Sequence, residues 1–101
     1  MADIDLEEML KQAQGLQAKL QEMQNAAAER TVESQSGGGM VRVVVDGAMR
    51  VRKIEIDPAV VAAGDKPMLE DLIVAAVNDA MERAKQMVAL EINKLNPLNK
   101  F

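Results

Sequence analysis

The clearest strand pattern in this sequence lies in Met40-Val41-Arg42-Val43-Val44-Val45, followed by Asp46-Gly47. Its alternation predicts a β-strand that places Val41, Val43 and Val45 on one face and Arg42 on the other. One face of the strand is thus expected to be buried and the other to be open to solvent. The rest of the chain is best interpreted outward from this strand.

A turn and a further strand follow directly. Asp46-Gly47 is typical of a tight hairpin turn, and the next strand is predicted from about Arg50 to Ile56. Val51 is out of phase with the apolar residues that end this strand, which predicts a bulge near Arg52-Lys53. Upstream, the polar segment 31–36 precedes three glycines and is expected to be an edge or pairing strand. The sequence therefore predicts three strands.

Two long helices are expected on either side of these strands. Apolar residues spaced alternately three and four apart run through residues 6–27, a coiled-coil seam of three heptads. Asp3 or Asp5 is expected to cap this helix. Asp57-Pro58 is predicted to open a short helical turn, and a second long helix is predicted over about 67–94. Its predicted buried stripe comprises Leu69, Leu72, Ile73, Ala76, Val77, Ala80, Met81, Ala84, Met87, Val88, Ile92 and Leu95.

The predicted fold class is α+β: a long N-terminal helix, a three-stranded antiparallel sheet, a short helical turn and a long C-terminal helix. We expect a single domain over residues 1–101, of which 96–101 form a short tail. A compact domain of this size has a diameter of about 35 Å. Each predicted helix is about as long as this diameter, whereas each predicted strand is only about 24 Å long. The small sheet cannot cover both apolar stripes along their length.

Either the two helices pair along the seam and overhang the sheet, or a second chain completes the burial. A polar strand and a heptad seam that both need partners favour a homodimer. The predicted dimer interface comprises Leu6, Met9, Ala13, Val32, Ser34, Val41 and Val43.

Composition argues against catalysis. The chain has no Cys, His, Trp or Tyr and one Phe. Of the residue types that usually act as general bases or nucleophiles, only Asp, Glu, Lys, Ser and Thr are therefore present. The segment Ser36-Gly37-Gly38-Gly39 precedes a strand instead of opening a helix and lacks a following Lys. It is therefore predicted to be a hairpin loop and not a phosphate loop. We predict a protein that is not an enzyme, with no cofactor, no metal and no small-molecule substrate.

No segment is predicted to enter a membrane. The N-terminus is acidic where a secretory signal needs positive charge. The longest apolar run, Leu72–Val77, is far shorter than the roughly 20 residues that cross a bilayer. We therefore expect a soluble protein of the cytoplasm without a membrane partner.

Charge is unevenly distributed. The chain carries a net charge of −4, but residues 30–53 hold five basic and two acidic residues, a net charge of +3 between two acidic segments. One interpretation is an ordinary solvated sheet face; the other is a phosphate-contacting patch, doubled in a dimer. Without aromatic residues for base stacking, any DNA contact should be to backbone and shape. The candidate residues of this segment are Arg42, Arg50, Arg52 and Lys53.

Four segments in order resemble the YbaB/EbfC family of bacterial nucleoid-associated proteins, and together they cover nearly the whole chain. They are Met9-Leu10-Lys11-Gln12-Ala13-Gln14, Ser36-Gly37-Gly38-Gly39, Ile54-Glu55-Ile56-Asp57-Pro58 and Leu69-Glu70-Asp71-Leu72-Ile73-Val74-Ala75-Ala76-Val77-Asn78-Asp79-Ala80.

The resemblance implies a tweezer-like homodimer whose sheets meet at the centre and whose paired long helices project as arms. It also implies binding of DNA, expected to be double-stranded, with a change in DNA conformation. Roles in nucleoid organisation, DNA protection and gene regulation follow from it, as does localisation to the nucleoid. Because helical arms are the family's usual DNA contacts, it adds the candidates Lys11, Lys19, Arg83, Lys85 and Lys94.

A second hypothesis stays open. Two copies of a chain with a net charge of −4 carry −8, which opposes tight DNA binding. Eight Met residues and a glutamine-rich first helix would also suit an adaptor that holds protein partners on its helix surfaces.

Overall fold

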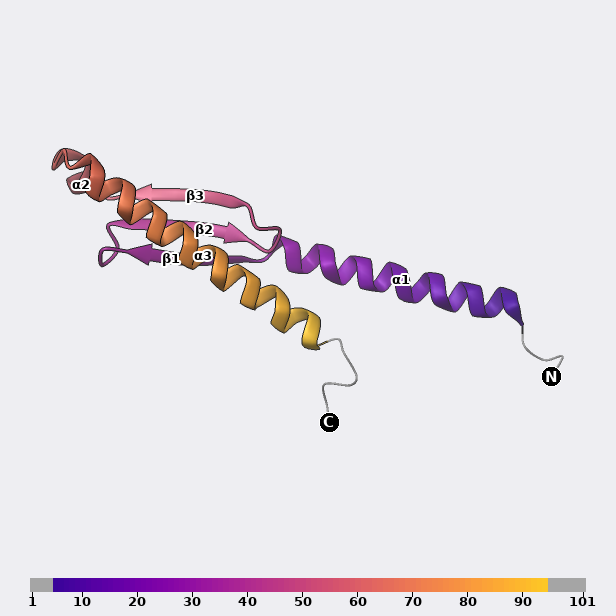
Figure 1. Ribbon diagram of the computed structural model, residues 1–101. Coiled ribbons are helices and arrows are strands. Elements are labelled where there is room, and N and C mark those ends of the chain that lie inside the picture. Colours follow the sequence, from indigo (N-terminus) through magenta and orange to yellow (C-terminus); the bar gives the residue numbers. More distant parts are fainter. Residues whose placement is uncertain (1–4, 95–101) are drawn as a thin grey trace.

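The helices and strands occur in the order that the sequence predicts (Figure 1). The computed structural model describes residues 5–94, so the predicted tail at 96–101, Leu95 and the alternative cap Asp3 lie outside the described residues. The elements are α1 (Leu6–Glu29), β1 (Thr31–Ser36), β2 (Val41–Asp46), β3 (Val51–Ile56), α2 (Pro58–Ala62) and α3 (Lys66–Lys94).

The three strands form one antiparallel sheet in the order β1-β2-β3, with β2 in the centre. Val41, Val43 and Val45 of β2 point to one face and are completely buried. Arg42, which alternates with them, lies on the exposed face. The alternation in β2 therefore separates a core face from an open face of the sheet.

A bulge interrupts the pairing of β2 with β3. Val45 lies opposite Val51, whereas Val44 lies opposite Lys53, so Arg52 is the extra residue on β3. The bulge returns Val51 to the core face of the sheet. The bulge predicted near Arg52-Lys53 is thus confirmed.

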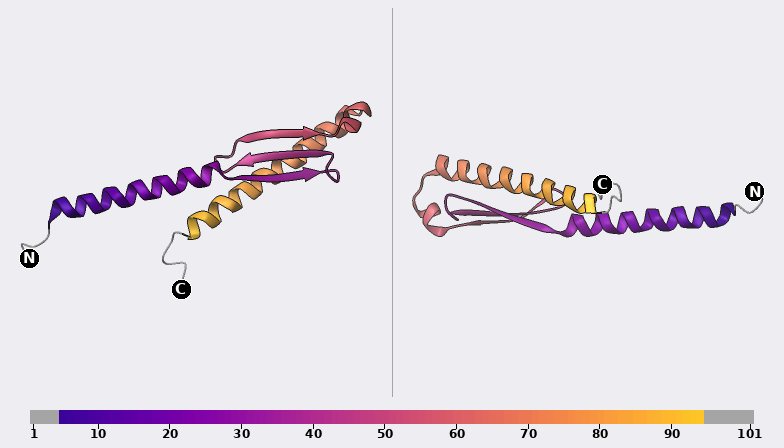
Figure 2. Two further views of the ribbon diagram at one scale, coloured as in Figure 1. Left: turned by 180° about the vertical axis from the view of Figure 1, so that it is seen from behind. Right: turned by 90° about the horizontal axis from the view of Figure 1, so that it is seen from below.

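Helix α3 lies across the core face of the sheet (Figure 2). Its smallest side chains face the strands. Ala76, Ala80 and Ala84 recur every four residues on one side of the helix and are completely buried. Their size lets the helix backbone lie close to β1 and β2, the two strands on which α3 mainly packs. Larger side chains flank the alanines and are partly buried: Leu69, Leu72, Ile73, Val77 and Met81.

Two apolar regions beside α3 remain uncovered. Because α3 lies over β1 and β2, the core face of β3 is open, and Val51 and Ile54 are 41% and 43% exposed. Ile92, predicted to be buried, is half exposed, because the C-terminal part of α3 runs past the sheet (Figure 1). The chain by itself does not bury all of its apolar surface.

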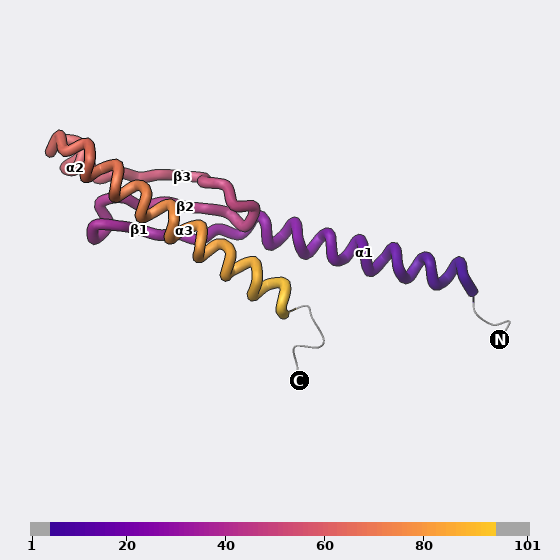
Figure 3. The backbone as a smooth tube through the Cα atoms, in the orientation of Figure 1, coloured from indigo at the N-terminus to yellow at the C-terminus, as the bar shows by residue number. Residues whose placement is uncertain are grey.

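Helix α1 leaves the sheet as a single arm (Figure 3). Asp5 caps it, since its Oδ1 accepts the backbone N–H of Glu7 at 3.0 Å. Every residue from 6 to 22 is exposed, and α1 contacts α3 only near its C-terminal end. The two long helices thus do not pair along the heptad seam within one chain.

The arm makes the chain far longer than a compact domain. The radius of gyration is 21.0 Å, compared with about 13 Å for a compact chain of 100 residues. The extents are 77 × 27 × 15 Å. The compact diameter assumed from chain length is therefore wrong for this fold.

Candidate nucleic-acid interface

The predicted DNA-binding residues lie in three separate parts of the molecule. Lys11 and Lys19 are on the α1 arm, and Arg83, Lys85 and Lys94 are on α3. The other four lie on the sheet or on the hairpin between β2 and β3: Arg42, Arg50, Arg52 and Lys53. All nine are exposed, so the structure presents them to solvent without gathering them into one patch.

The open face of the sheet is electrically balanced. The strand register places Arg42 opposite Glu55, and Lys53 opposite Val44, whose other neighbour is Glu33. Two cations and two carboxylates therefore share this face. Lys53 Nζ lies 2.5 Å from Glu55 Oε1. This hydrogen bond raises the pKa of Lys53 and lowers the pKa of Glu55. The +3 segment of the sequence does not become a uniformly positive surface.

Arg52 has a structural partner in the buried carboxylate of Asp46. Its Nε donates to Asp46 Oδ2 at 2.8 Å, while Asp46 Oδ1 accepts the backbone N–H groups of Ala48 at 2.9 Å and Arg50 at 3.0 Å. Chiefly the Arg52 hydrogen bond, and then that of Arg50, lowers the pKa of Asp46. Asp46 therefore organises the hairpin and takes up part of the charge of Arg52.

Arg83 belongs to a polar link between α3 and β1. Its Nε donates to Asp79 Oδ2 at 2.9 Å, an ion pair between residues four positions apart, a spacing that brings side chains together on one helix face. The hydroxyl of Ser34 on β1 donates to the same oxygen. Hydrogen bonds from Ser34 and then Arg83 lower the pKa of Asp79. Arg83 is thus partly neutralised.

Five candidates form no ion pair with another described residue. Among residues 5–94 none of them has an acidic group within 4.0 Å. They are Lys11, Lys19, Arg42, Arg50 and Lys85. These side chains are the most available for phosphate oxygens, because binding breaks no existing ion pair.

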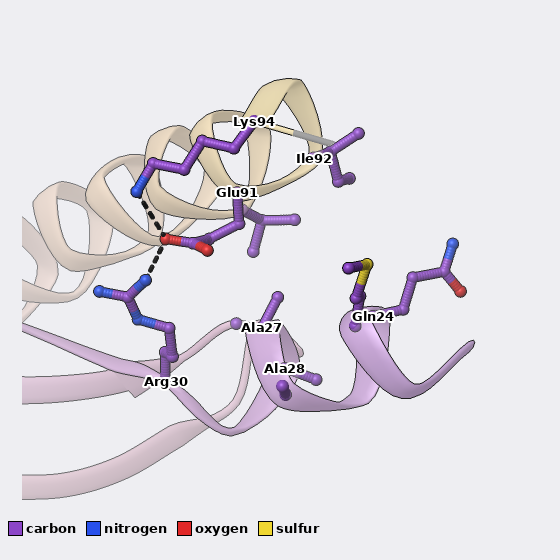
Figure 4. Close-up of a pocket in the computed structure, with 11 residues that line it drawn as sticks. Gln24, Ala27, Ala28, Arg30, Glu91, Ile92 and Lys94 are labelled. Atoms are coloured by element: carbon purple, nitrogen blue, oxygen red, sulfur yellow. Dashed lines mark hydrogen bonds and ion pairs between the residues drawn. The ribbon is translucent and has the colours of Figure 1, made fainter. Parts of the chain in front are cut away.

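The structure adds one cation that sequence reasoning left out of the candidate set. Arg30, the residue between α1 and β1, pairs with Glu91 of α3, and Lys94 lies 3.4 Å from the same carboxylate oxygen (Figure 4). Arg30 and Glu91 are 61 positions apart. No local pattern links residues so far apart, so the sequence held no signal for this cluster.

The predicted dimer-interface residues divide into two groups. Leu6, Met9 and Ala13 are exposed on the α1 arm, and Val32 of β1 is partly buried. The other three are already covered by α3 of the same chain: Ser34, Val41 and Val43. Of the predicted residues, the three on the arm present the apolar surface that a second chain could cover: Leu6, Met9 and Ala13.

Neither a metal centre nor a membrane-spanning helix is found in the described part of the chain. Within residues 5–94 no three His, Cys, Asp or Glu side chains lie in a group that could hold a metal ion. None of the described helices combines the length and the apolar character needed to cross a bilayer.

Comparison with known proteins gives the same match along nearly the whole chain. The model of the YbaB/EbfC DNA-binding family matches residues 1–98. The nucleoid-associated protein Teth514_0034 of Thermoanaerobacter sp. strain X514 is 44% identical over 91 residues, which cover 90% of this chain and 82% of that protein. A nucleoid-associated protein of Acetivibrio thermocellus is 43% identical over 91 residues, 90% of this chain and 80% of that protein.

A solved structure shares the fold. The crystal structure of the uncharacterized protein HP0035 from Helicobacter pylori superposes with a TM-score of 0.72 at 22% sequence identity. The match covers 92% of this chain and 99% of that one. The arm, sheet and crossing helix are thus seen together in an experimentally determined structure.

Proposed function

Because the chain belongs to the YbaB/EbfC DNA-binding family, we propose that it is a nucleoid-associated protein that binds double-stranded DNA as a homodimer. In this proposal the protein contacts phosphates and duplex shape, not base edges, and changes the conformation of the DNA. It acts in the nucleoid, within the cytoplasm, without catalysis. The names of its relatives support the nucleoid assignment.

The spacing of the five candidate cations that form no ion pair supports contact with the phosphate backbone of DNA. Lys11 and Lys19 lie on the arm, Arg42 and Arg50 on the sheet and hairpin, and Lys85 on α3, in a chain 77 Å long. Single cations distributed in this way suit successive phosphates of a duplex, whereas base reading needs several donors directed into one groove. Because the whole chain carries a net negative charge, the affinity for DNA would come from these individual cations and would fall with rising salt concentration.

The uncovered apolar surface supports the homodimer. Val51 and Ile54 form an open apolar strip on β3, which is also an edge strand with one unpaired side. The seam of α1, which includes Leu16 and Leu20, is exposed along the arm. Soluble monomers rarely expose apolar strips of this kind. A second copy would cover both regions and leave the arms to project, and isologous pairing of this kind is the commonest protein symmetry.

A salt-titrated gel shift tests the proposal. We expect a short duplex to be shifted at low salt, with a log–log slope of about −0.9 per phosphate contacted. Lys11→Gln, Lys19→Gln and Lys85→Gln should each weaken binding and lower the slope by about 1. Lys66→Gln is the matched control, because Lys66 is equally exposed but is not among the proposed contacts.

Two results would contradict DNA binding through these cations. The first is no shift at low salt by a correctly folded protein. The second is an equal loss of affinity in Lys66→Gln and in the three test variants, which would mean that overall charge alone matters.

A protein-partner adaptor is the second candidate function. It is favoured by the exposed apolar seam of α1, which a protein helix could cover as well as a second copy, and by the acidity of the chain. A folded protein that binds a stoichiometric protein partner after nuclease treatment, and shifts no DNA at low salt, would select this function over the first.

A further inference from the structure

One residue joins the arm to the body of the protein. Helix α1 ends at Glu29 and β1 begins at Thr31, so Arg30 alone separates them. Arg30 has extended backbone angles, and its N–H donates to the carbonyl of Ala27 at 3.2 Å. The direction of the whole arm therefore depends on what surrounds this junction.

The β2–β3 hairpin supports the junction on one side. The backbone N–H of Gly47 donates to the carbonyl of Arg30 at 2.9 Å. Gly47 also lies directly against the Ala27 carbonyl, with no room for a side chain. Asp46 fixes the hairpin through three hydrogen bonds. This side of the junction is a rigid backbone contact, which salt does not screen strongly.

Charged side chains hold the junction on the other side. The guanidinium of Arg30 and the ammonium of Lys94 both bind one oxygen of Glu91 on α3 (Figure 4). Glu91 is partly buried, whereas Arg30 and Lys94 are more than half exposed. Two cations thus share a single carboxylate at the point where α1 and α3 approach each other.

The two helices are not closely packed at this point. An apolar cavity of about 320 Å³ lies between them, lined by side chains that include Met23, Ala27, Val88 and Ile92. Closely packed helices leave no space of this size between them. Beyond the cavity every residue of α1 from 6 to 22 is exposed. Within one chain, the described residues therefore hold the arm to α3 near the C-terminal end of α1, through the ion pairs of Glu91 and the apolar residues that line the cavity.

We propose that Arg30, Glu91 and Lys94 form a salt-sensitive latch that holds the α1 arm against α3. When the latch opens, the arm pivots at Arg30 on the hairpin while the sheet and α3 stay in place. A partly exposed ion pair contributes little free energy and is weakened by salt. The protein therefore populates both the arm position with the latch closed and the position with the latch open. The salt concentration shifts the ratio of these two populations. This inference does not depend on DNA binding.

Spin labels can measure the direction of the arm, because the chain has no native cysteine. Gln14→Cys on α1 and Gln86→Cys on α3 place labels on exposed positions of the two helices. Labelled chain is mixed with an excess of unlabelled chain, so that only distances within one chain are read. Distance distributions are recorded at about 0.05 M and about 1 M NaCl, where screening lengths differ severalfold.

In the otherwise unmodified protein we expect one dominant distance at low salt and about a threefold larger population of other distances at high salt. Glu91→Gln should show the broad distribution already at low salt and should not respond to salt. The double variant Arg30→Glu with Glu91→Arg should restore the narrow distribution. Glu82→Gln is the matched control, because it removes an exposed carboxylate of α3 that has no ion pair within the described residues.

Identical distributions for Glu91→Gln and the unmodified protein would overturn the latch, as would an unmodified protein that does not respond to salt. Arg30→Gln provides a second test if Glu91→Gln loses helix content or unfolds at a lower temperature. Agreement of Glu82→Gln with Glu91→Gln would also refute the latch, because it would assign the effect to the overall charge of α3.

Discussion

Gly47 touches Ala27 backbone to backbone. A Cβ atom at position 47 would lie 2.1 Å from the carbonyl oxygen of Ala27 and 3.0 Å from the Cα of Ala28. The φ angle of Gly47 is not positive. Glycine is therefore required here by the close approach of the hairpin to the end of α1, and not by an unusual backbone conformation.

Gly47→Ala should destabilise the protein by about 3 kcal/mol, the upper range for a side chain forced into a filled space, because the atoms it meets are backbone and cannot rotate away. Urea unfolding followed by circular dichroism measures the change. Gly15→Ala is the matched control: a Cβ there meets nothing within 4 Å, so alanine should stabilise helix α1 by about 1 kcal/mol. Similar stabilities for both variants would contradict the close contact.

Ala80→Leu should destabilise the protein by about 1–3 kcal/mol, because Ala80 is completely buried between α3 and the valine face of the sheet. The helix would have to move away from β1 and β2 to admit the larger side chain. Ala75→Leu, on the exposed side of the same helix, should change the free energy of unfolding by less than about 0.5 kcal/mol. Equal effects in a thermal melt would mean that α3 packs on the sheet through another face.

Asp46 should make the stability of the fold depend on pH in acid. Its pKa is lowered in the folded protein, so it contributes stability that is fully present above its pKa in the unfolded chain, about 3.9. That contribution is lost as pH falls below this value toward the folded pKa. Asp46→Asn should therefore lower stability at neutral pH and reduce the acid dependence below about pH 4.

Urea unfolding midpoints of the Asp46→Asn variant and the unmodified protein, measured from neutral pH to about pH 3, test this dependence across the unfolded pKa. The two curves should converge as pH falls. Curves that stay parallel through this range would show that Asp46 is not the responsible carboxylate.

Ile54→Glu should raise the dissociation constant of the proposed dimer about tenfold or more, because it places a charge on the uncovered apolar strip of β3. Analytical ultracentrifugation across a concentration series measures the shift. Val61→Glu on α2 is the control, since Val61 is 60% exposed and lies outside the strip. An unchanged constant for Ile54→Glu would remove β3 from the interface.

Local patterns predicted the elements well, because a helix or a strand is encoded by neighbours in the sequence. The alternation around Val43, the cap at Asp5 and the bulge at Arg52 each follow from a few adjacent residues. The same holds for the Asp79–Arg83 ion pair, whose partners are one helical turn apart.

Relationships between distant segments were not predictable in this way. The pairing of Arg30 with Glu91 and the covering of Ser34 by α3 depend on how α3 crosses the sheet, which no spacing encodes. The basic segment was open to two interpretations, a solvated sheet face or a phosphate-contacting patch, and the register that places Glu55 opposite Arg42 across β2 and β3 is one that no local spacing encodes. The size rule for compact domains failed because it assumes that every element joins one core.

Because helix α1 is held to the body of the protein at one end, the arm also acts as a lever. Its 24 residues form a rod of about 36 Å, so a rotation of about 10° at Arg30 displaces the far end by about 6 Å. That displacement is about half the width of the DNA major groove, yet atoms next to Arg30 would move by only a fraction of an ångström. In the proposed dimer, mechanical amplification of this kind would let the two arms adjust their separation to duplexes of different curvature, while the alanine–valine core beneath α3 remained undisturbed.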